Sequence, residues 1–307
     1  MPDTTVTEEK KTLFSGSSPI LNRAAHVRLS LARRNLDHPE RIDAELPNLM
    51  HTQSQLSQQD SIEATYFLIH YVKALSPYLL QRGYDMLLLK WCDGGLRECE
   101  RFRRNPGWLR LLRGNAQYNL GEWNEAESEL QTALKLSEDT DRQTYTRALV
   151  ALGHLQFSRG DYVAALKTLD KAKLLLIKHL GFEQLDIIEQ LGIIHVIITK
   201  YHLQRGDLDK ALSLCLEDNA EITDVADRLL MLGMIYREKK AYEMAIKCLQ
   251  NALHIINSME SSRSKAVTAM HHLAWVFLDL GDVDSARSWF MQAQAKGVFL
   301  EGKKFHS

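Results

Sequence analysis

The feature that most constrains the fold is residues 107–136, which are predicted to form a hairpin of two amphipathic helices. Apolar residues recur there at three- and four-residue steps, which places them along one face of each helix. Gly121 separates the two runs, and glycine at a helix end adopts the left-handed conformation without a Cβ clash. Small residues recur where the helices would cross: Gly114, Ala116, Ala126 and Ala133. Because helix axes approach to about 8–10 Å across such residues, we expect a closely packed pair.

The same pattern returns four times further along the chain, so the hairpin is a repeating unit. The turn between the two helices is marked by Lys240 in the fourth copy and by glycine in the others, namely Gly121, Gly160, Gly206 and Gly281. The intervals between copies are uneven, and the largest excess lies near residues 172–191. This excess predicts that the second helix of the second copy extends past its usual end.

The small, aromatic and alanine positions of residues 107–296 resemble those of the tetratricopeptide (TPR) repeat. Five copies in series make the resemblance specific, since one degenerate copy carries little information. It implies an all-α fold, a right-handed TPR superhelix (α-α solenoid) with an N-terminal helical segment. The expected organisation is a disordered tail, N-terminal helices with a degenerate hairpin, five repeats and a second tail, over residues 1–18, 19–106, 107–300 and 301–307.

The N-terminal part is predicted to be helical as well. Apolar periodicity indicates helices at about residues 19–37, 40–58 and 61–82. A partner helix follows, and the pair Gly94-Gly95 is expected to interrupt or end it. The pair of helices over residues 62–99 resembles a worn TPR hairpin in which Leu87 takes the usual alanine position.

Residues 41–49 and 75–96 also resemble the segment that opens the helical-repeat sensor of bacterial STAND-type signalling ATPases. In those proteins an acidic-x-x-asparagine-leucine segment precedes a hydrophobic helix that ends in arginine-glycine. The matching residues here are Glu45, Asn48, Leu49, Arg82 and Gly83. The chain has no GxxxxGK[ST] phosphate loop, so the resemblance implies a sensor-like module without the ATPase.

Composition excludes several classes of function. The chain has 307 residues, 45% of them hydrophobic, and a net charge of −1, which favours a soluble globular protein with no general attraction to nucleic acid or membranes. No apolar run of signal-peptide length opens the sequence. The four cysteines fit no metal-binding spacing and are expected to be buried free thiols: Cys92, Cys99, Cys215 and Cys248. Together these features predict a cytoplasmic protein.

Catalytic motifs are missing from the sequence. It contains no HExxH, GxSxG, GxGxxG or EF-hand pattern. The neighbours His271 and His272 point about 100° apart on a helix, which is poor geometry for binding one metal. We therefore expect no enzyme activity, no cofactor and no metal.

Binding is the better supported function, since the first helix of each hairpin in a stacked array turns one face to the concave side. We expect a non-catalytic scaffold or adaptor whose groove binds a protein or peptide, with amides and cations for polar groups and aromatic rings for apolar side chains. The predicted groove residues are Asn115, Tyr118, Asn119, His154, Phe157, Lys200, Leu203, Gln204, Met234, Arg237, His271 and Trp275. The same faces carry Leu111, Val150, Ser158, Val196, Leu230, Glu238, Leu278 and Asp279. For the apolar ones, packing against a neighbouring helix is an equally good interpretation.

Two alternative functions remain open from the sequence. One is a signal-peptide sensor or regulator that changes curvature when its ligand binds, and the other is a client-specific assembly chaperone. Asn115, Lys200 and Arg237 resemble parts of the carboxylate clamp in the heat-shock-chaperone type of TPR protein. His154 stands where that clamp has a second asparagine, so an acidic or C-terminal peptide is expected as partner without the chaperone assignment.

The end of the last repeat, at about Lys296, is predicted to leave an apolar face uncovered, because repeat arrays usually need a polar capping helix. The apolar residues that follow would fold back over this face: Val298, Phe299 and Leu300. Otherwise the C-terminal repeat is expected to mediate self-association or to contact a partner.

Overall fold

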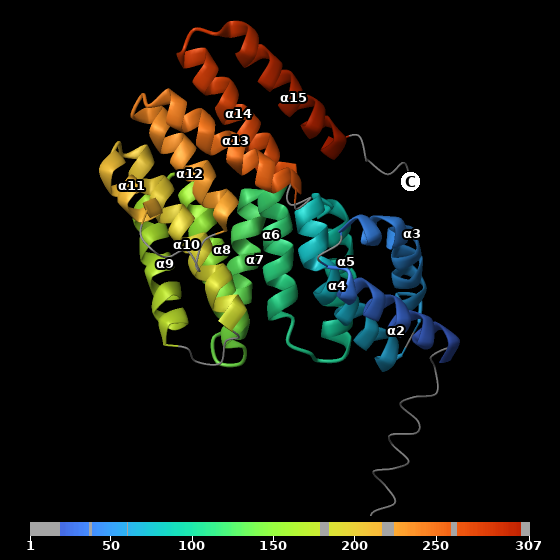
Figure 1. Cartoon of the computed structure of the whole chain (residues 1–307). Helices are drawn as coiled ribbons and strands as arrows, with labels where there is room; N and C mark the ends of the chain where they lie inside the picture. The colour runs from blue at the N-terminus through green and yellow to red at the C-terminus, as the bar shows by residue number, and fades with distance from the viewer. Residues whose placement is uncertain are drawn as a thin grey trace, which may run out of the picture. The chain divides into compact units, whose positions relative to one another are not determined.

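The computed structural model describes residues 19–36, 39–59, 61–178, 184–216, 224–258 and 263–301. Within these ranges every regular element is an α-helix (Figure 1). This confirms the predicted all-α fold of paired helices. The chain divides into two compact units, Met1–Ser137 and Glu138–Ser307. The predicted N-terminal tail lies outside the described residues, and the domain boundaries proposed from the sequence stay a prediction.

The first unit contains helices α2 to α7. The first three lie within three residues of the ranges that apolar periodicity predicts. Their bounds are α2 (Pro19–Arg34), α3 (Pro39–Leu56), α4 (Ile62–Arg82), α5 (Asp85–Arg101), α6 (Gly107–Asn119) and α7 (Trp123–Ser137). The helices α4 and α5 pack together, as do α6 and α7, while α2 and α3 both pack on α4.

Two buried tyrosines in the largely aliphatic core of the first unit hold neighbouring helices through their hydroxyl groups. Tyr71 donates to the carbonyl oxygen of Ala25 on α2 at 3.1 Å. Tyr78 donates to Oδ1 of Asp43 on α3 at 2.6 Å, and Arg82 donates to Oδ2 of the same carboxylate at 2.6 Å. Burial and the charge of Asp43 raise the pKa of Tyr78. The phenol therefore stays protonated and acts as a donor between α3 and α4.

The prediction that Gly94 and Gly95 break a helix is wrong, because α5 runs through both residues. A Cβ atom at Gly95 would lie 3.1 Å from Cδ1 of Leu109 on α6. The missing side chain at Gly95 therefore gives Leu109 room to pack against α5. Sequence reasoning identified an unusual glycine and assigned it to a helix end instead of a close contact between helices.

The residue that takes the usual alanine position of the repeat in the hairpin of α4 and α5 also needs a correction. The N–H of Leu88 binds the carbonyl of Tyr84 after the turn, as the N–H of Ala126 binds that of Glu122. The equivalent residue is therefore the fully buried Leu88 and not Leu87.

The second unit contains helices α8 to α15, which form four hairpins in chain order. Their bounds are α8 (Arg142–Ser158), α9 (Tyr162–Ile177), α10 (Gln184–Gln204), α11 (Leu208–Leu216), α12 (Val225–Glu238), α13 (Tyr242–Ser258), α14 (Arg263–Asp279) and α15 (Val283–Glu301). Consecutive pairs pack together: α8 with α9, α10 with α11, α12 with α13 and α14 with α15 (Figure 1).

Two helix ends in this unit differ from the prediction. The helix α9 ends at Ile177, so the excess residues of that repeat do not extend it. They lengthen instead the next incoming helix, α10, to 21 residues. The helix α15 continues to Glu301, past the predicted end at about Lys296. The side chains of the residues expected to fold back over the last hairpin lie outside the described part.

In three hairpins the two helices cross at the same kind of contact between a glycine and a leucine. A Cβ atom at Gly233 would lie 2.5 Å from Cγ of Leu249, closer than any real carbon–carbon contact allows. Two other hairpins show the same relation, with Cβ positions 2.6 Å and 2.9 Å from leucine Cδ2: Gly153 with Leu169 and Gly114 with Leu130. The leucine side chain fills the space that a Cβ atom would take. This contact fixes how closely the helices approach.

The turns between paired helices use a left-handed residue at one equivalent position. Gly121 has a φ of 80°, and the N–H of the next residue, Glu122, returns to the carbonyl of Gln117. In the fourth repeat Lys240 takes this conformation with a φ of 60°. A side chain in this region is strained, because its Cβ approaches the backbone.

We predict opposite effects for two glycine-to-alanine substitutions. Gly233→Ala should destabilise the protein by about 1–3 kcal/mol, since its methyl group would overlap Leu249. Gly94→Ala should stabilise it by up to about 1 kcal/mol, because this helical position has open space around it. Urea unfolding followed by circular dichroism measures both. Equal effects of the two substitutions would show that the glycine–leucine contact does not set the hairpin geometry.

A second prediction concerns the strained turn. Lys240→Gly should stabilise the protein by up to about 1 kcal/mol, because glycine adopts positive φ without strain. Lys240→Ala is the matched control, since it removes the same side chain but keeps the Cβ atom that is strained at a φ of 60°. Thermal unfolding of both variants beside the parent gives the comparison. A loss of stability for Lys240→Gly would contradict the strain at this turn.

Candidate functional site

The first helices of the hairpins in the second unit lie side by side. The helix α8 packs on α10, α10 packs on α12, and α12 packs on α14. Between α10, α12 and α14 lies a cleft with a volume of about 170 Å³. Its lining residues are Val196, Lys200, Asp227, Leu230, Met231, Met234, Ser264, Lys265, Thr268 and His272.

One side of the cleft is apolar. Leu230 and Met231 are buried, and Val196 and Met234 are half-buried beside them. Methionine side chains adapt to ligands of different shape because they are unbranched and polarisable. A cavity of about 150 Å³ holds a benzene molecule. The cleft is therefore of the size that accepts a single large apolar side chain.

Charged residues on the opposite side join two of the helices. The ammonium group of Lys265 on α14 lies 2.9 Å from Oδ2 of Asp224 and 2.8 Å from Oδ2 of Asp227, both on the N-terminal turn of α12. Burial disfavours the charge of Lys265, but the two carboxylates outweigh burial and raise its pKa. Lys265 is thus a charged link between α12 and α14, and its charge is already compensated.

Lys200 lies in the same cleft but forms no ion pair of the kind that Lys265 makes with Asp224 and Asp227 in the described part of the chain. It is half-buried on α10, and burial lowers its pKa while the charge of Asp227 acts in the opposite direction. Among the described residues, none forms a hydrogen bond or ion pair with its ammonium group. Burial and the charge of Lys200 lower the pKa of His154 on α8 to about 4. Lys200 therefore places a positive charge at the α10 side of the cleft, where it interacts with the charge of Asp227.

His272 faces this cationic region from α14. Burial, followed by the charges of Arg237, Lys200 and His271, lowers its pKa to about 4, so the ring is neutral at pH 7. Its Nδ1 atom is buried and has no hydrogen-bond partner in the described part of the chain. A buried ring nitrogen without a partner has lost its hydrogen bond to water, which costs free energy in the folded state.

Sequence reasoning found only part of this cleft. It predicted Val196, Lys200, Leu230 and Met234, and the structure brings all four together. On α14 the sequence analysis selected His271. Its ring packs instead near Phe290 of α15, with the two ring centres 6.0 Å apart. Four residues line the cleft from α14, and three of them are spaced by four, a signal that was present in the sequence: Ser264, Thr268 and His272, together with Lys265.

Two further groove residues contact neighbours on the last two hairpins. Nε of Arg237 donates to Oδ2 of Asp279 at 2.6 Å, and its guanidinium lies 5.6 Å from the ring centre of Trp275. Trp275 meets Phe290 of α15 edge to face at 5.5 Å. Arg237 is therefore already ion-paired, which weakens its prediction as a cation for a ligand. That Arg237 and Trp275 contact a ligand stays a prediction.

The remaining residues of the predicted groove in this unit lie outside the cleft. Phe157 is buried and contacts Tyr162 of its own hairpin, with ring centres 5.3 Å apart. Leu203 is half-buried and packs on the cluster around Ile235, while Gln204 is exposed at the end of α10. Phe157 thus has a packing role, and the other two stay predictions as ligand contacts.

Three predicted groove residues belong to the first unit. On α6, Asn115 and Tyr118 are half-buried, and Asn119 is exposed. Asn119 donates from Nδ2 to Oδ1 of Asp85 at 2.8 Å, which holds α6 to the start of α5. Burial raises the pKa of Asp85, although the bond from Asn119 opposes this shift. This contact gives Asn119 a structural role.

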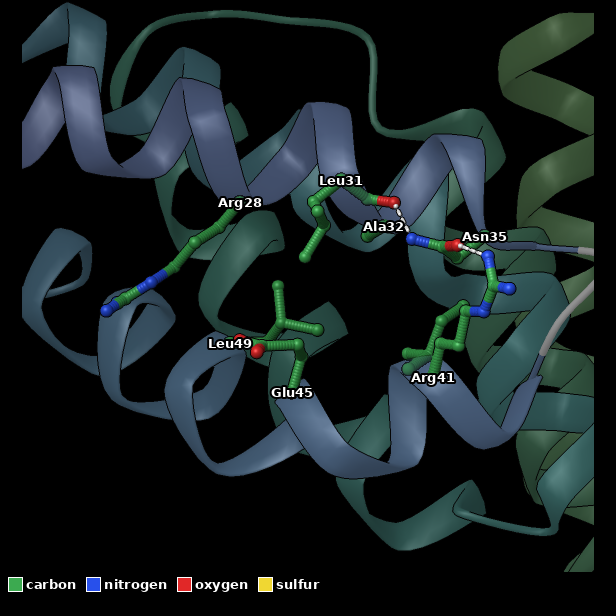
Figure 2. A pocket seen from close by; sticks show the side chains of 8 residues that line it. Arg28, Leu31, Ala32, Asn35, Arg41, Glu45 and Leu49 are labelled. Carbon is green, nitrogen blue, oxygen red and sulfur yellow. Dashed lines mark hydrogen bonds between the residues drawn. The ribbon is translucent and has the colours of Figure 1, made fainter.

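A second, much smaller pocket lies between α2 and α3 in the first unit. Figure 2 shows Leu31 and Leu49 pointing toward each other from the two helices. Beside them Nη1 of Arg41 donates to Oδ1 of Asn35 at 3.3 Å. The pocket has a volume of about 10 Å³, which is room for one water molecule. It is too small to be a ligand site.

Other site chemistry is limited in the part of the chain that the structure describes. There, no three His, Cys, Asp or Glu side chains gather closely enough to hold a metal ion. No helix of that part combines the length and apolar character needed to cross a bilayer. The four cysteines are buried free thiols, as predicted, and burial raises the pKa of Cys92 to about 12.

Two stretches of the chain match models of the tetratricopeptide repeat, residues 111–174 and residues 225–295. A curated relative, the clustered mitochondria protein homolog of Danio rerio, is 27% identical over 133 residues. This match covers 40% of the chain and only 9% of that much longer protein.

The resemblance to the STAND sensor stays a prediction, because both repeat matches lie downstream of it.

Solved structures share the fold at low sequence identity. A Rap protein complexed with competence and sporulation factor is 15% identical, with a TM-score of 0.68 over 97% of this chain and 80% of that one. NprR in complex with its cognate peptide NprX is 17% identical, with a TM-score of 0.57 over 92% and 85%. The two family matches identify tetratricopeptide repeats at residues 111–174 and 225–295, and the solved structures show that the chain shares their fold of paired helices.

Proposed function

We propose that the chain is a non-catalytic adaptor that binds a peptide segment of another protein at the cleft between α10, α12 and α14. The observation that carries this proposal is the combination of an apolar side with Lys200 in a space that accepts one large side chain. Peptide recognition commonly uses this arrangement, in which a pocket takes an anchor residue and nearby polar groups orient the chain.

The predicted residues outside the cleft would extend the site along the same helices. Leu203 and Gln204 continue the face of α10 toward its C-terminal end, and His271 and Trp275 lie on α14. A bound segment of several residues would reach them from the cleft. A cytoplasmic location and self-association through the C-terminal repeat remain part of the proposal.

A second candidate is a peptide sensor, and two of the similar structures favour it. The Rap protein is complexed with competence and sporulation factor, and NprR is complexed with its cognate peptide NprX. A cleft for a single side chain suits a short ligand equally well. The sensor and the adaptor differ in the size of ligand that binds tightly. The assembly chaperone would instead need a folded client.

We predict that partner capture depends on the apolar side of the cleft. Met234→Gln should weaken binding at least about tenfold, because an amide in this position must lose its water when the ligand enters. Met244→Gln is the matched control, since Met244 is exposed on α13, which does not line the cleft. Affinity capture with the full chain, quantified by mass spectrometry, measures both. Equal loss or equal retention in the two variants would place the binding site elsewhere.

Ligand size should separate the two candidates. For a sensor, a synthetic peptide of the captured region binds as tightly as the whole partner and changes the radius of gyration of the chain. An adaptor should bind the same peptide without a measurable change in shape. Calorimetry and small-angle X-ray scattering with that peptide give both quantities. A partner that binds only when folded would contradict both candidates and favour the chaperone.

A further inference from the structure

The helix α2 concentrates positive charge in a chain that is nearly neutral as a whole. The sequence has 38 basic and 39 acidic residues. In contrast, α2 carries four arginines and neither aspartate nor glutamate. This local excess is hidden by the net charge of −1 and needs an explanation from the structure.

Two of the four arginines contact the neighbouring helices. Nη1 of Arg28 donates to the carbonyl oxygen of Asn48 on α3 at 3.1 Å and also to Oγ1 of Thr52. Nη2 of Arg33 lies 3.3 Å from Nδ1 of His70 on α4. Burial, followed by the charges of Arg33 and Lys73, lowers the pKa of His70. The edge of α4 beside α2 is therefore cationic as well.

The other two arginines lie on the exposed face of α2 together with two apolar side chains. Arg23 and Arg34 are exposed, and neither forms a hydrogen bond or ion pair among the described residues. Between them Val27 is 59% exposed, and Leu31, which borders the small pocket of Figure 2, is 43% exposed. Steps of four, four and three residues place all four side chains along one stripe of the helix, which we call the α2 stripe.

We propose that the α2 stripe binds an acidic amphipathic helix of a partner protein. Carboxylates of that helix pair with Arg23 and Arg34, and its apolar side chains pack on Val27 and Leu31. Recognition between helices commonly uses apolar contacts at three- and four-residue steps, with flanking charges that select the partner. This surface belongs to the first unit, whereas the cleft belongs to the second, so the chain has a binding surface in each.

Two other anionic partners fit the α2 stripe less well. A helix that lies on a membrane inserts its apolar face into the bilayer. The apolar face of α2 is already used in the core, where Ala25, Leu29 and Ala32 are at most 4% exposed. A nucleic acid would supply phosphates for the arginines but no aliphatic side chains to cover Val27 and Leu31.

Three blocked peptides of about 18 residues, or five helical turns, test the inference with the full chain. The first has leucine along one helical face and glutamate elsewhere. The second has glutamine in place of every glutamate, and the third keeps the glutamates but distributes the leucines around the helix. Methyl NMR of isotope-labelled valine and leucine follows Val27 and Leu31. Phosphatidylserine vesicles and single-stranded poly(U) RNA represent the other anions, and light scattering measures self-association.

The first peptide should shift the methyl signals of Val27 and Leu31 with saturation. The other two peptides should bind at least about tenfold more weakly, because each lacks one half of the complementary surface. Binding of the first peptide should weaken at least about threefold between about 0.05 and 0.3 M salt, since salt screens exposed charges.

The arginines should be needed as a pair. Arg23→Gln together with Arg34→Gln should weaken binding of the first peptide at least about tenfold. The charge-matched control is Arg142→Gln together with Arg287→Gln, two exposed positions on α8 and α15, which should behave like the parent.

The apolar part has its own matched pair of variants. Val27→Asn should weaken binding at least about threefold, because the amide must lose water at the interface. Val163→Asn should have no effect, since Val163 is 82% exposed on α9, outside the stripe. Circular dichroism establishes that each variant is folded, which these exposed positions favour.

The inference is overturned if the first peptide leaves Val27 and Leu31 unaffected, if either matched peptide binds as tightly, or if the arginine pair can be replaced without loss. Tighter binding of vesicles or RNA at these residues overturns it in favour of that anion. Self-association that the double arginine variant abolishes overturns it in favour of a second copy of the chain.

Discussion

A contact between a helical glycine and a buried leucine determines how closely the two helices approach in three hairpins of this chain. At Gly114, Gly153 and Gly233 the leucine of the second helix fills the volume that a side chain on the first helix would need. The helices approach closely at this point, and the contact therefore sets a limit on their spacing. Packing between hairpins then follows from the apolar faces that each pair leaves uncovered.

The cleft is a consequence of this arrangement in the second unit. Since each second helix packs on its own first helix, the first helices α10, α12 and α14 are left to line a shared surface. Lys265 ties α14 to α12 through Asp224 and Asp227, which positions His272 on the cleft. The residues that hold the site are therefore different from those proposed to contact a ligand.

The sequence predicted the helices and hairpins well, because spacing along one chain determines them. It was less reliable where the outcome depends on contacts between distant residues. Gly95 looked like a helix end because the partner that needs its space, Leu109, belongs to the next helix. Arg237 looked like a free cation because its ion pair with Asp279 joins residues 42 positions apart. On α14 the sequence pattern selected His271, whereas the neighbouring residue His272 lines the cleft.

The central claim is that a peptide binds where α10, α12 and α14 meet. A crystal structure of the chain with a peptide from its captured partner tests this claim most directly. Our account predicts electron density for one apolar ligand side chain against Leu230 and Met234, with the peptide continuing along the first helices. Density for the ligand on the outer helices α11, α13 or α15, with this cleft empty, would contradict it.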